Sequence, residues 1–162
     1  MRVTPAVMSD LEPLADLWVE LAAGQKAFGS HLRAEVNRPT IRESLARHIT
    51  IDGVLVARDE ADDDILGFVM FEVEVGTYEQ DVTRGTISNL FVVPERRGDG
   101  LGGRLLDAAE TELRDAGVDV VALDVMADNE AARRFYRRHG YGPHRIELEK
   151  SIQNDTHSKE DR

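Results

Sequence analysis

The residues with the clearest chemical potential lie between Val92 and Gly103, where four glycines and two adjacent arginines share one short segment. Glycines allow successive backbone N–H groups to converge, and the start of a helix adds the positive end of its dipole. Arg96, Arg97 and Arg104 bring positive charge to the same place. The segment therefore predicts a cradle for a diphosphate, with a glycine-rich turn that binds nothing as the alternative.

Two familiar phosphate-binding motifs do not fit this segment. No Gly-Lys-Ser/Thr sequence ends the loop, which disfavours a nucleotide triphosphatase. The glycines at 98, 100, 102 and 103 do not have the dinucleotide-binding spacing, and no first strand of a βαβ unit precedes them near the N-terminus.

Alternating strands and helices surround the loop and would position it. Apolar and β-branched runs predict strands at residues 1–7, 54–57, 65–75, 86–93, 118–125 and 141–148. Helical spacing predicts helices after Ser9 or Asp10, over 40–49 with Thr40 as cap, over 101–116 and over 129–139. This order, without repeat or internal linker, predicts one α/β domain over residues 1–150 and a polar tail over 151–162.

Composition limits the possible functions. The 162 residues include 31 acidic and 20 basic ones, for a net charge of −11, which disfavours a nucleic-acid partner. An acid-rich, lysine-poor surface resembles that of proteins from salt-loving cells, although an ordinary acidic protein is the alternative. The chain has no cysteine, no apolar run long enough for a membrane span and no visible secretory signal, so we expect a cytoplasmic enzyme.

A second segment strengthens the interpretation of the first. It reads Asp124-Val125, then Asn129-x-x-Ala132-x-x-Phe135-Tyr136-x-x-x-Gly140-Tyr141. Together with Arg97-Gly98-Asp99-Gly100-Leu101-Gly102 and the preceding Asn89-Leu90-Phe91-Val92-Val93-Pro94, it resembles the GNAT superfamily of acyl-CoA-dependent N-acetyltransferases. The glycine loop is similar to that family's Gln/Arg-x-x-Gly-x-Gly/Ala motif, and the two segments cover about a third of the chain.

The resemblance implies a fold and a cofactor site. The fold would be a mixed, mostly antiparallel sheet, splayed near Val92 and flanked by about four helices. Acetyl-CoA would be the acyl donor, with no metal. The residues implied in its binding are Phe91, Val92 and Val93, then Arg97, Gly98, Asp99, Gly100, Leu101, Gly102 and Gly103, and finally Asn129.

The resemblance also implies catalytic roles. Tyr136 would protonate the departing thiolate, which suits a phenol that keeps its proton at neutral pH; a core aromatic is the alternative. Glu72 is our candidate for the base, with a solvated strand residue as the alternative, because Asn89 stands where some relatives carry an acid. Without cysteine, the amine would attack the thioester directly.

The acceptor would bind between the first two helices and the loop joining the two long strands. Phe28, His31 and Tyr78 are the candidate substrate-binding residues there. A small-molecule amine and a protein amine both remain open, a homodimer is compatible with the family, and we expect neither nucleic acid nor membrane as partner. The five histidines show no metal-ligand spacing. A non-catalytic acyl-CoA sensor and an interaction protein without cofactor are the rival functions.

Overall fold

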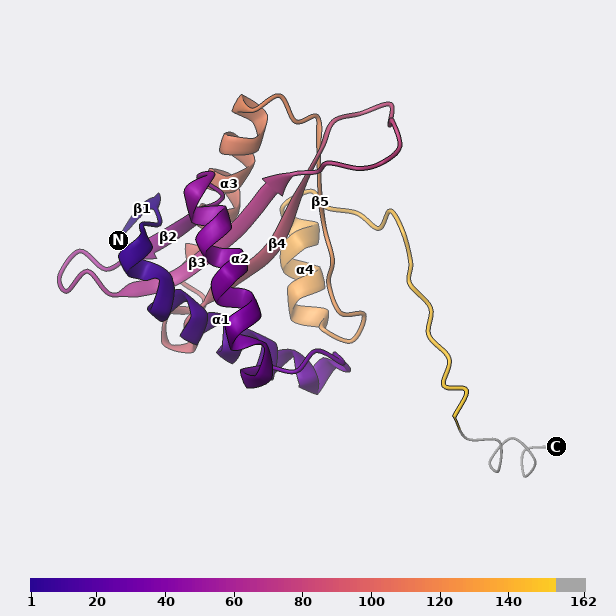
Figure 1. The fold of residues 1–162 in the computed structure, drawn as a ribbon, viewed down its shortest axis with the longest axis horizontal. Helices are drawn as coiled ribbons and strands as arrows, with labels where there is room; N and C mark the ends of the chain where they lie inside the picture. The colour runs from indigo at the N-terminus through magenta and orange to yellow at the C-terminus, as the bar shows by residue number, and fades with distance from the viewer. Residues whose placement is uncertain (154–162) are drawn as a thin grey trace. The chain divides into compact units, whose positions relative to one another are not determined.

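The structure is a computed structural model of the chain, and it describes residues 1–153. Its contacts divide into two units, Met1–Glu130 and Ala131–Arg162. The first unit holds the sheet and three of the helices, and the second holds most of the fourth (Figure 1). The part of the expected tail from 154 to 162 lies outside the described residues.

The first unit is built on one mixed sheet of five strands in the order β1-β2-β3-β4-β5. The first four pair antiparallel, and β5 pairs parallel with β4. The bounds are Arg2–Pro5 for β1, Val54–Arg58 for β2, Ile65–Val73 for β3, Arg84–Val92 for β4 and Val120–Leu123 for β5. The expected mixed, mostly antiparallel sheet is therefore confirmed.

Residues 1–153 contain four α-helices, the number expected. They are α1 (Leu11–Gln25), α2 (Arg38–Thr50), α3 (Leu101–Asp115) and α4 (Glu130–Arg138). Figure 1 shows α1 and α2 together over one face of the sheet and α3 over the other. Helix α3, which follows the glycine loop, therefore lies on one face of β3 and β4. Helices α1 and α2, which border the expected acceptor region, lie on the other.

The alternation of side chains along β3 explains this layering. Phe68 and Met70 point to the α1–α2 face and join its apolar cluster, which also contains Leu14 and Leu45. Gly67 faces α3, where a Cβ atom on it would lie 3.2 Å from Leu105 Cδ1 and 2.6 Å from Phe91 O. Only glycine lets β3, β4 and α3 approach this closely, so the position of Phe91 depends on it.

Asp10, one of the two expected caps, is the N-cap residue of α1. Asp10 makes no capping hydrogen bond to the helix; its carboxylate accepts a hydrogen bond from Val7 N (2.8 Å) and forms an ion pair with Arg58. Both side chains of that pair are nearly buried, with 8% and 11% exposure. Asp10 therefore ties the start of α1 to β2, because a buried carboxylate requires a charged partner.

Two local predictions are wrong. Helix α2 begins at Arg38 with Pro39 in its first turn, so Thr40 lies inside the helix rather than at its cap; a proline with fixed φ suits that first turn. Residues 141–148 form no strand, although Ile146 and Leu148 alternate as a strand would. These side chains are 76% and 88% exposed, and no neighbouring strand in the described part of the chain pairs with them.

None of the helices in residues 1–153 is long and apolar enough to cross a membrane.

Candidate active site

The glycine loop connects β4 to α3 and leaves backbone amides open. Gly98 and Gly100 have φ of +88° and +81°, a conformation that residues with a Cβ rarely adopt. Gly100 is the N-cap of α3 and has no side chain to occupy the amides of the first turn. A Cβ on either glycine would meet no atom within 4 Å. The loop therefore has both the donors and the space that a phosphate group needs.

Arg96 of the loop is held by carboxylates of the surrounding chain. Arg96 lies between the carboxylates of Asp59 (3.3 Å) and Asp99 (3.4 Å). The pKa of the Asp59 carboxyl is lowered, mainly by the hydrogen bond from the Ala61 amide and further by Arg96. These contacts tie the loop to the turn between β2 and β3, so its backbone is restrained before any ligand arrives.

Arg97 folds back over the end of β4. Its Nε donates to Val92 O (3.0 Å), and its guanidinium carbon lies 5.4 Å from the centre of the Phe91 ring. The loop thus places a positive charge beside the last residues of β4.

One edge of β4 is open beside this loop. The parallel pairing of β5 ends at Ile87 opposite Leu123, whereas β4 continues to Val92. Over 88–92, this edge has no strand partner in the described residues. The pairing between β4 and β5 therefore ends before Val92, and an unpaired strand edge is a place where an extended ligand can pair with the backbone.

The hydrogen-bond pattern shows which backbone groups face that edge. Val93 N donates to Leu66 O (2.9 Å), so residue 93 faces β3. Facing alternates along an antiparallel ladder, which turns the N–H and C=O of Val92 away from β3. The bond from Arg97 to Val92 O confirms this direction. Val92 is therefore the residue of the predicted Phe91–Val93 segment whose backbone N–H and C=O face the open edge.

Glu72 lies farther along the same face of the sheet. It follows Phe68 and Met70 on β3 and stands opposite Thr86, whereas Phe68 stands opposite Phe91. Four residues of strand separate Glu72 from Phe68, or about 13 Å. Glu72 is therefore well removed along the strands from the β4 end at which Phe91 lies. Asn89 stands opposite Met70, midway between the positions opposite Phe68 and Glu72, and its amide donates to Met70 Sδ (3.4 Å).

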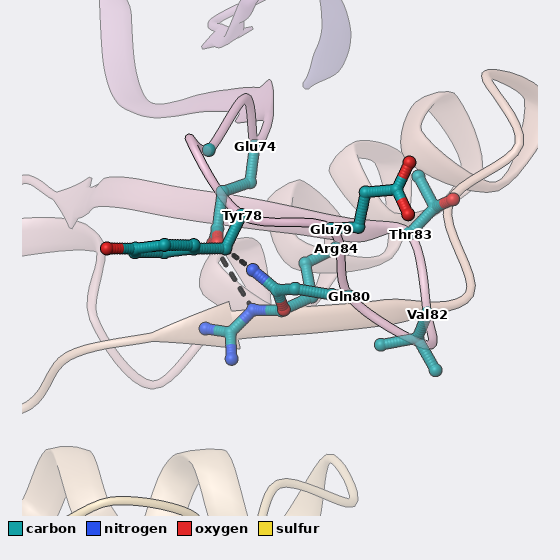
Figure 2. Close-up of a pocket in the computed structure, with 8 residues that line it drawn as sticks. Glu74, Tyr78, Glu79, Gln80, Val82, Thr83 and Arg84 are labelled. Atoms are coloured by element: carbon teal, nitrogen blue, oxygen red, sulfur yellow. Dashed lines mark hydrogen bonds and ion pairs between the residues drawn. The ribbon is translucent and has the colours of Figure 1, made fainter.

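The loop between β3 and β4 borders an open hollow of about 320 Å³ (Figure 2). Its lining comprises Glu74, Gly76, Tyr78, Glu79, Gln80, Val82, Thr83 and Arg84. Glu74 accepts from Gln80 (3.2 Å) and pairs with Arg84 (3.2 Å), as the dashed lines show. The hydrogen bond from Gln80 is the main cause that lowers the pKa of the Glu74 carboxyl, followed by the charge of Arg84.

The predicted acceptor residues do not all meet in this hollow. Tyr78 lines it and is 86% exposed. Phe28 and His31 follow α1, in the turn around Gly29, and are not part of the lining. The prediction therefore corresponds to two separate features of the first unit, the end of α1 and the β3–β4 loop.

The remaining predicted residues lie around α4. Asn129 directly precedes the helix, and its N–H donates to Met126 O (3.0 Å). Tyr136, in the second unit, packs edge-on against Phe135 and Tyr141 at ring-centre distances of 5.1 and 5.8 Å. Burial raises the pKa of the Tyr136 phenol. The phenol is therefore held in its protonated form throughout the neutral range.

His48 lies beside Glu72 in the structure, although no sequence motif singles it out. This side chain, on α2, is 5% exposed, and its Nδ1 lies 2.8 Å from Ser44 O. Its Nε2 lies 3.5 Å from Glu72 Oε2. A lone histidine in an amphipathic helix has no recognisable sequence signal, because its partner comes from a strand far along the chain. Within residues 1–153, no group of three or more His, Cys, Asp or Glu side chains could hold a metal ion.

Comparison with known proteins places this arrangement in a family. Residues 18–141 match the model of the acetyltransferase (GNAT) family. An uncharacterized N-acetyltransferase of Archaeoglobus fulgidus is 31% identical over 136 residues, which cover 84% of this chain and 89% of that protein. A mycothiol acetyltransferase of Clavibacter michiganensis subsp. michiganensis is 36% identical over 76% of this chain, but only 38% of that protein is covered.

Solved structures show the same fold. The BH1408 protein of Bacillus halodurans, in its tetramutant form, has a TM-score of 0.78 with 24% identity, over 94% of this chain and 100% of that one. An N-acetyltransferase of Thermoplasma acidophilum, solved in complex with coenzyme A, has a TM-score of 0.74 with 20% identity, over 90% and 92% of the two chains. From the glycine loop, the unpaired edge of β4 and the family match, we conclude that the chain is an acetyltransferase of the GNAT family.

Proposed function

We propose that this enzyme transfers an acetyl group from acetyl-CoA to a primary amine by direct attack of the amine on the thioester. The observation that carries the proposal is the junction between β4 and α3, where open amides follow an unpaired strand edge. A phosphate group and an extended, amide-containing arm are the two chemical features that such a junction accommodates, and coenzyme A has both.

The cofactor would lie along this junction. Its diphosphate would accept hydrogen bonds from the loop amides, and its pantetheine arm would pair with the open edge of β4. The residues proposed for the diphosphate are Arg97, Gly98, Asp99, Gly100, Leu101, Gly102 and Gly103. The arm would pair with Phe91–Val93 and meet Asn129. The thioester chemistry belongs to the cofactor, and the chain supplies binding, orientation and proton transfer.

The amide of Val92 is the proposed donor to the thioester oxygen. Val93 N is already bonded to Leu66 O, so it has no proton to offer. The Val92 N–H faces the open edge, where the developing negative charge of the tetrahedral intermediate would lie. Because the N–H direction alternates along the ladder, the Val92 amide is the one in the Phe91–Val93 segment that faces the open edge.

Tyr136 is the proposed general acid for the leaving thiolate. A general acid must hold its proton at the working pH, and burial of the phenol raises its pKa and favours the protonated form. Glu72 is the proposed base. Because it lies about 13 Å along β3 from the register partner of Phe91, it would act on the amine through water or on an acceptor that extends toward it.

The acceptor is proposed to be a primary amine with a polar or cationic body. Glu74 is neutralised by Arg84, but the exposed carboxylate of Glu79 in the same lining favours a positive charge. Related enzymes include an aminoalkylphosphonate N-acetyltransferase of Salmonella typhimurium, 26% identical over 75% of this chain, and the mycothiol acetyltransferases. Both a small amine and a protein amine are compatible with the open loop.

The test has two stages. Thermal unfolding is measured with acetyl-CoA, with dephospho-CoA and with NAD; at 100 times its Kd a ligand stabilises by about 2.7 kcal/mol. Stabilisation by acetyl-CoA and not by NAD supports the cofactor, and release of CoA is then followed with a panel of amines. Binding without turnover of any amine would favour an acyl-CoA sensor instead. No stabilisation of a folded sample would refute the cofactor assignment.

The Tyr136→Phe variant tests the acid separately. We expect kcat to fall by about 10²-fold or more, with the Kd for acetyl-CoA nearly unchanged, because only the proton donor is removed. Equal turnover in the variant would remove Tyr136 from the mechanism and leave the cofactor assignment intact.

A further inference from the structure

His48 is a buried polar residue with one unused nitrogen. It lies on α2 with 5% of its side chain exposed, and its Nε2 makes no hydrogen bond with any residue in the part of the chain that the structure describes. The nearest carboxylate oxygen is Glu72 Oε2, 3.5 Å away, on a side chain that is 47% exposed and comes from β3. A buried nitrogen without a partner is uncommon and calls for an explanation.

The other ring nitrogen fixes where a proton can go. Nδ1 lies 2.8 Å from Ser44 O, and a carbonyl oxygen can only accept. Nδ1 must therefore carry a hydrogen. In the neutral imidazole, Nε2 then presents a lone pair toward a carboxylate, which is unfavourable for both groups. One added proton between Nε2 and Oε2 relieves this, whichever of the two atoms holds it.

We propose that His48 is a positioning residue for the general base, and that it shares with Glu72 the proton that Glu72 takes from the acceptor amine. For Glu72 to act as the base, the pair must start with an ionised carboxylate and a neutral imidazole, and thus with one negative charge and no shared proton. As the amine nitrogen forms its bond to the acetyl carbon, its proton passes to Glu72, directly or through water. The pair then holds one proton and no net charge, and the proton leaves to solvent through the exposed side of Glu72.

The backbone around His48 makes this arrangement rigid. The turn after α2 brings Gly53 N to 2.7 Å from His48 O, and a Cβ on Gly53 would lie 3.4 Å from the imidazole ring. The ring is therefore confined by the turn that joins α2 to β2, whereas 47% of the Glu72 side chain is exposed. The 3.5 Å separation is only a few tenths of an ångström longer than an ordinary hydrogen bond.

The neighbouring charged groups named here are exposed to solvent or already paired, so they do not compete for a proton between His48 and Glu72. Arg47 and Asp52 flank His48 along the chain and are exposed to solvent. Glu74, two residues after Glu72 on β3, is already paired with Arg84 at 3.2 Å. The shortest separation between a charged group and Nε2 is thus the one to Glu72.

The inference rests on the proposed role of Glu72 as the base. A double-mutant cycle tests the role of His48 separately from that role. Glu72→Gln, His48→Gln and the double variant are compared by kcat/KM for the acceptor. We expect a loss of about 10²-fold or more for Glu72→Gln. We expect about 3- to 100-fold for His48→Gln, and no further loss in the double variant, because both changes remove the same proton site. Acetyl-CoA affinity should be unchanged in all three.

Two further variants control for folding. His48→Asn keeps an N–H for Ser44 O but cannot reach Glu72, so it should lose activity like His48→Gln while retaining its thermal stability better. His144→Gln, an exposed histidine of the second unit, should leave activity unchanged. Losses that multiply in the double variant, or a His48→Asn variant with full activity, would overturn the proposal, because His48 would then act independently of Glu72.

A measurement without turnover completes the test. Imidazole ¹⁵N shifts, assigned to His48 by comparison with His48→Asn, report on which ring nitrogen is protonated. We expect the hydrogen of the wild-type ring on Nδ1, where Ser44 O accepts it, and we expect the ¹⁵N shift of Nε2 to differ between Glu72→Gln and the wild type, because Glu72 Oε2 is its neighbour. An unchanged Nε2 shift would refute the pair even if Glu72 is the base. A changed Nε2 shift with a fully active Glu72→Gln would refute the base and keep the pair.

Discussion

Replacing Gly100 by alanine tests the glycine loop most directly, because Gly117 provides a matched control. Both glycines have a left-handed backbone, with φ of +81° and +90°, at opposite ends of α3. A Cβ on either would meet no protein atom within 4 Å. The cost of each substitution in the free protein is therefore backbone strain alone, about 1–2 kcal/mol. For a chain of this size, that lowers Tm by a few degrees in both variants.

The two variants should differ once acetyl-CoA is added. The space beside Gly100 is where the diphosphate is proposed to lie, so the new methyl group would displace it from at least one amide. A hydrogen bond to a charged group contributes about 1.5–3 kcal/mol, and we expect the Kd to rise by about tenfold or more. At a concentration 100 times the wild-type Kd, a tenfold loss reduces the stabilisation from about 2.7 to about 1.4 kcal/mol.

The assay is thermal unfolding of the wild type, Gly100→Ala and Gly117→Ala across a series of acetyl-CoA concentrations. Gly117→Ala should lose stability and keep the full ligand-induced shift, whereas Gly100→Ala should lose part of both. If Gly100→Ala retains the full shift, the loop does not hold the diphosphate. If both variants lose the shift equally, the effect comes from the instability of α3 and not from the loop.

Three further predictions use other parts of the chain. Because burial raises the pKa of Tyr136 and a general acid must be protonated, kcat should be maintained up to about pH 10 and fall above it, as a pH–rate profile would show. Asp10→Ala leaves Arg58 buried without its carboxylate and should cost about 3 kcal/mol in urea unfolding; an unchanged midpoint would contradict the role of this pair. Gly24→Ala, inside α1 with nothing within 4 Å of its Cβ, should stabilise by about 0.5 kcal/mol; a loss of stability would show that glycine is needed there.

The glycine loop could be predicted from the sequence because its information is local. Strand, glycine turn and amphipathic helix follow one another between residues 86 and 116, and each is readable from hydrophobic spacing and turn residues. The bounds differ from the prediction by only a few residues. The second segment, beginning at Asn129, is equally local, and the family match extends over both.

Features that depend on distant partners could not be predicted in the same way. Nothing in the order of residues brings His48 next to Glu72, since that contact arises only when α2 packs against β3. The alternation of Ile146 and Leu148 predicts a strand, but a strand also requires a neighbour to pair with, and sequence spacing does not supply one. The buried pair of Asp10 and Arg58 joins residues 48 positions apart, so the sequence predicts the place of Asp10 at the start of α1 but not its ion pair.

Arg97 connects the stability of the free enzyme to cofactor binding. An unpaired strand edge such as that of β4 is prone to pair with other chains, and a charged side chain folded onto it reduces that tendency. Arg97 donates to Val92 O, the backbone acceptor that faces the open edge. A pantetheine arm pairing at Val92 would have to displace this contact, whose net contribution is about 1 kcal/mol. The positive charge remains nearby and can then turn toward the diphosphate. Arg97→Ala removes both the contact that the pantetheine arm must displace and the positive charge near the diphosphate. The first change favours binding and the second weakens it, so the net loss of affinity should be smaller than the loss of a charge-assisted contact alone.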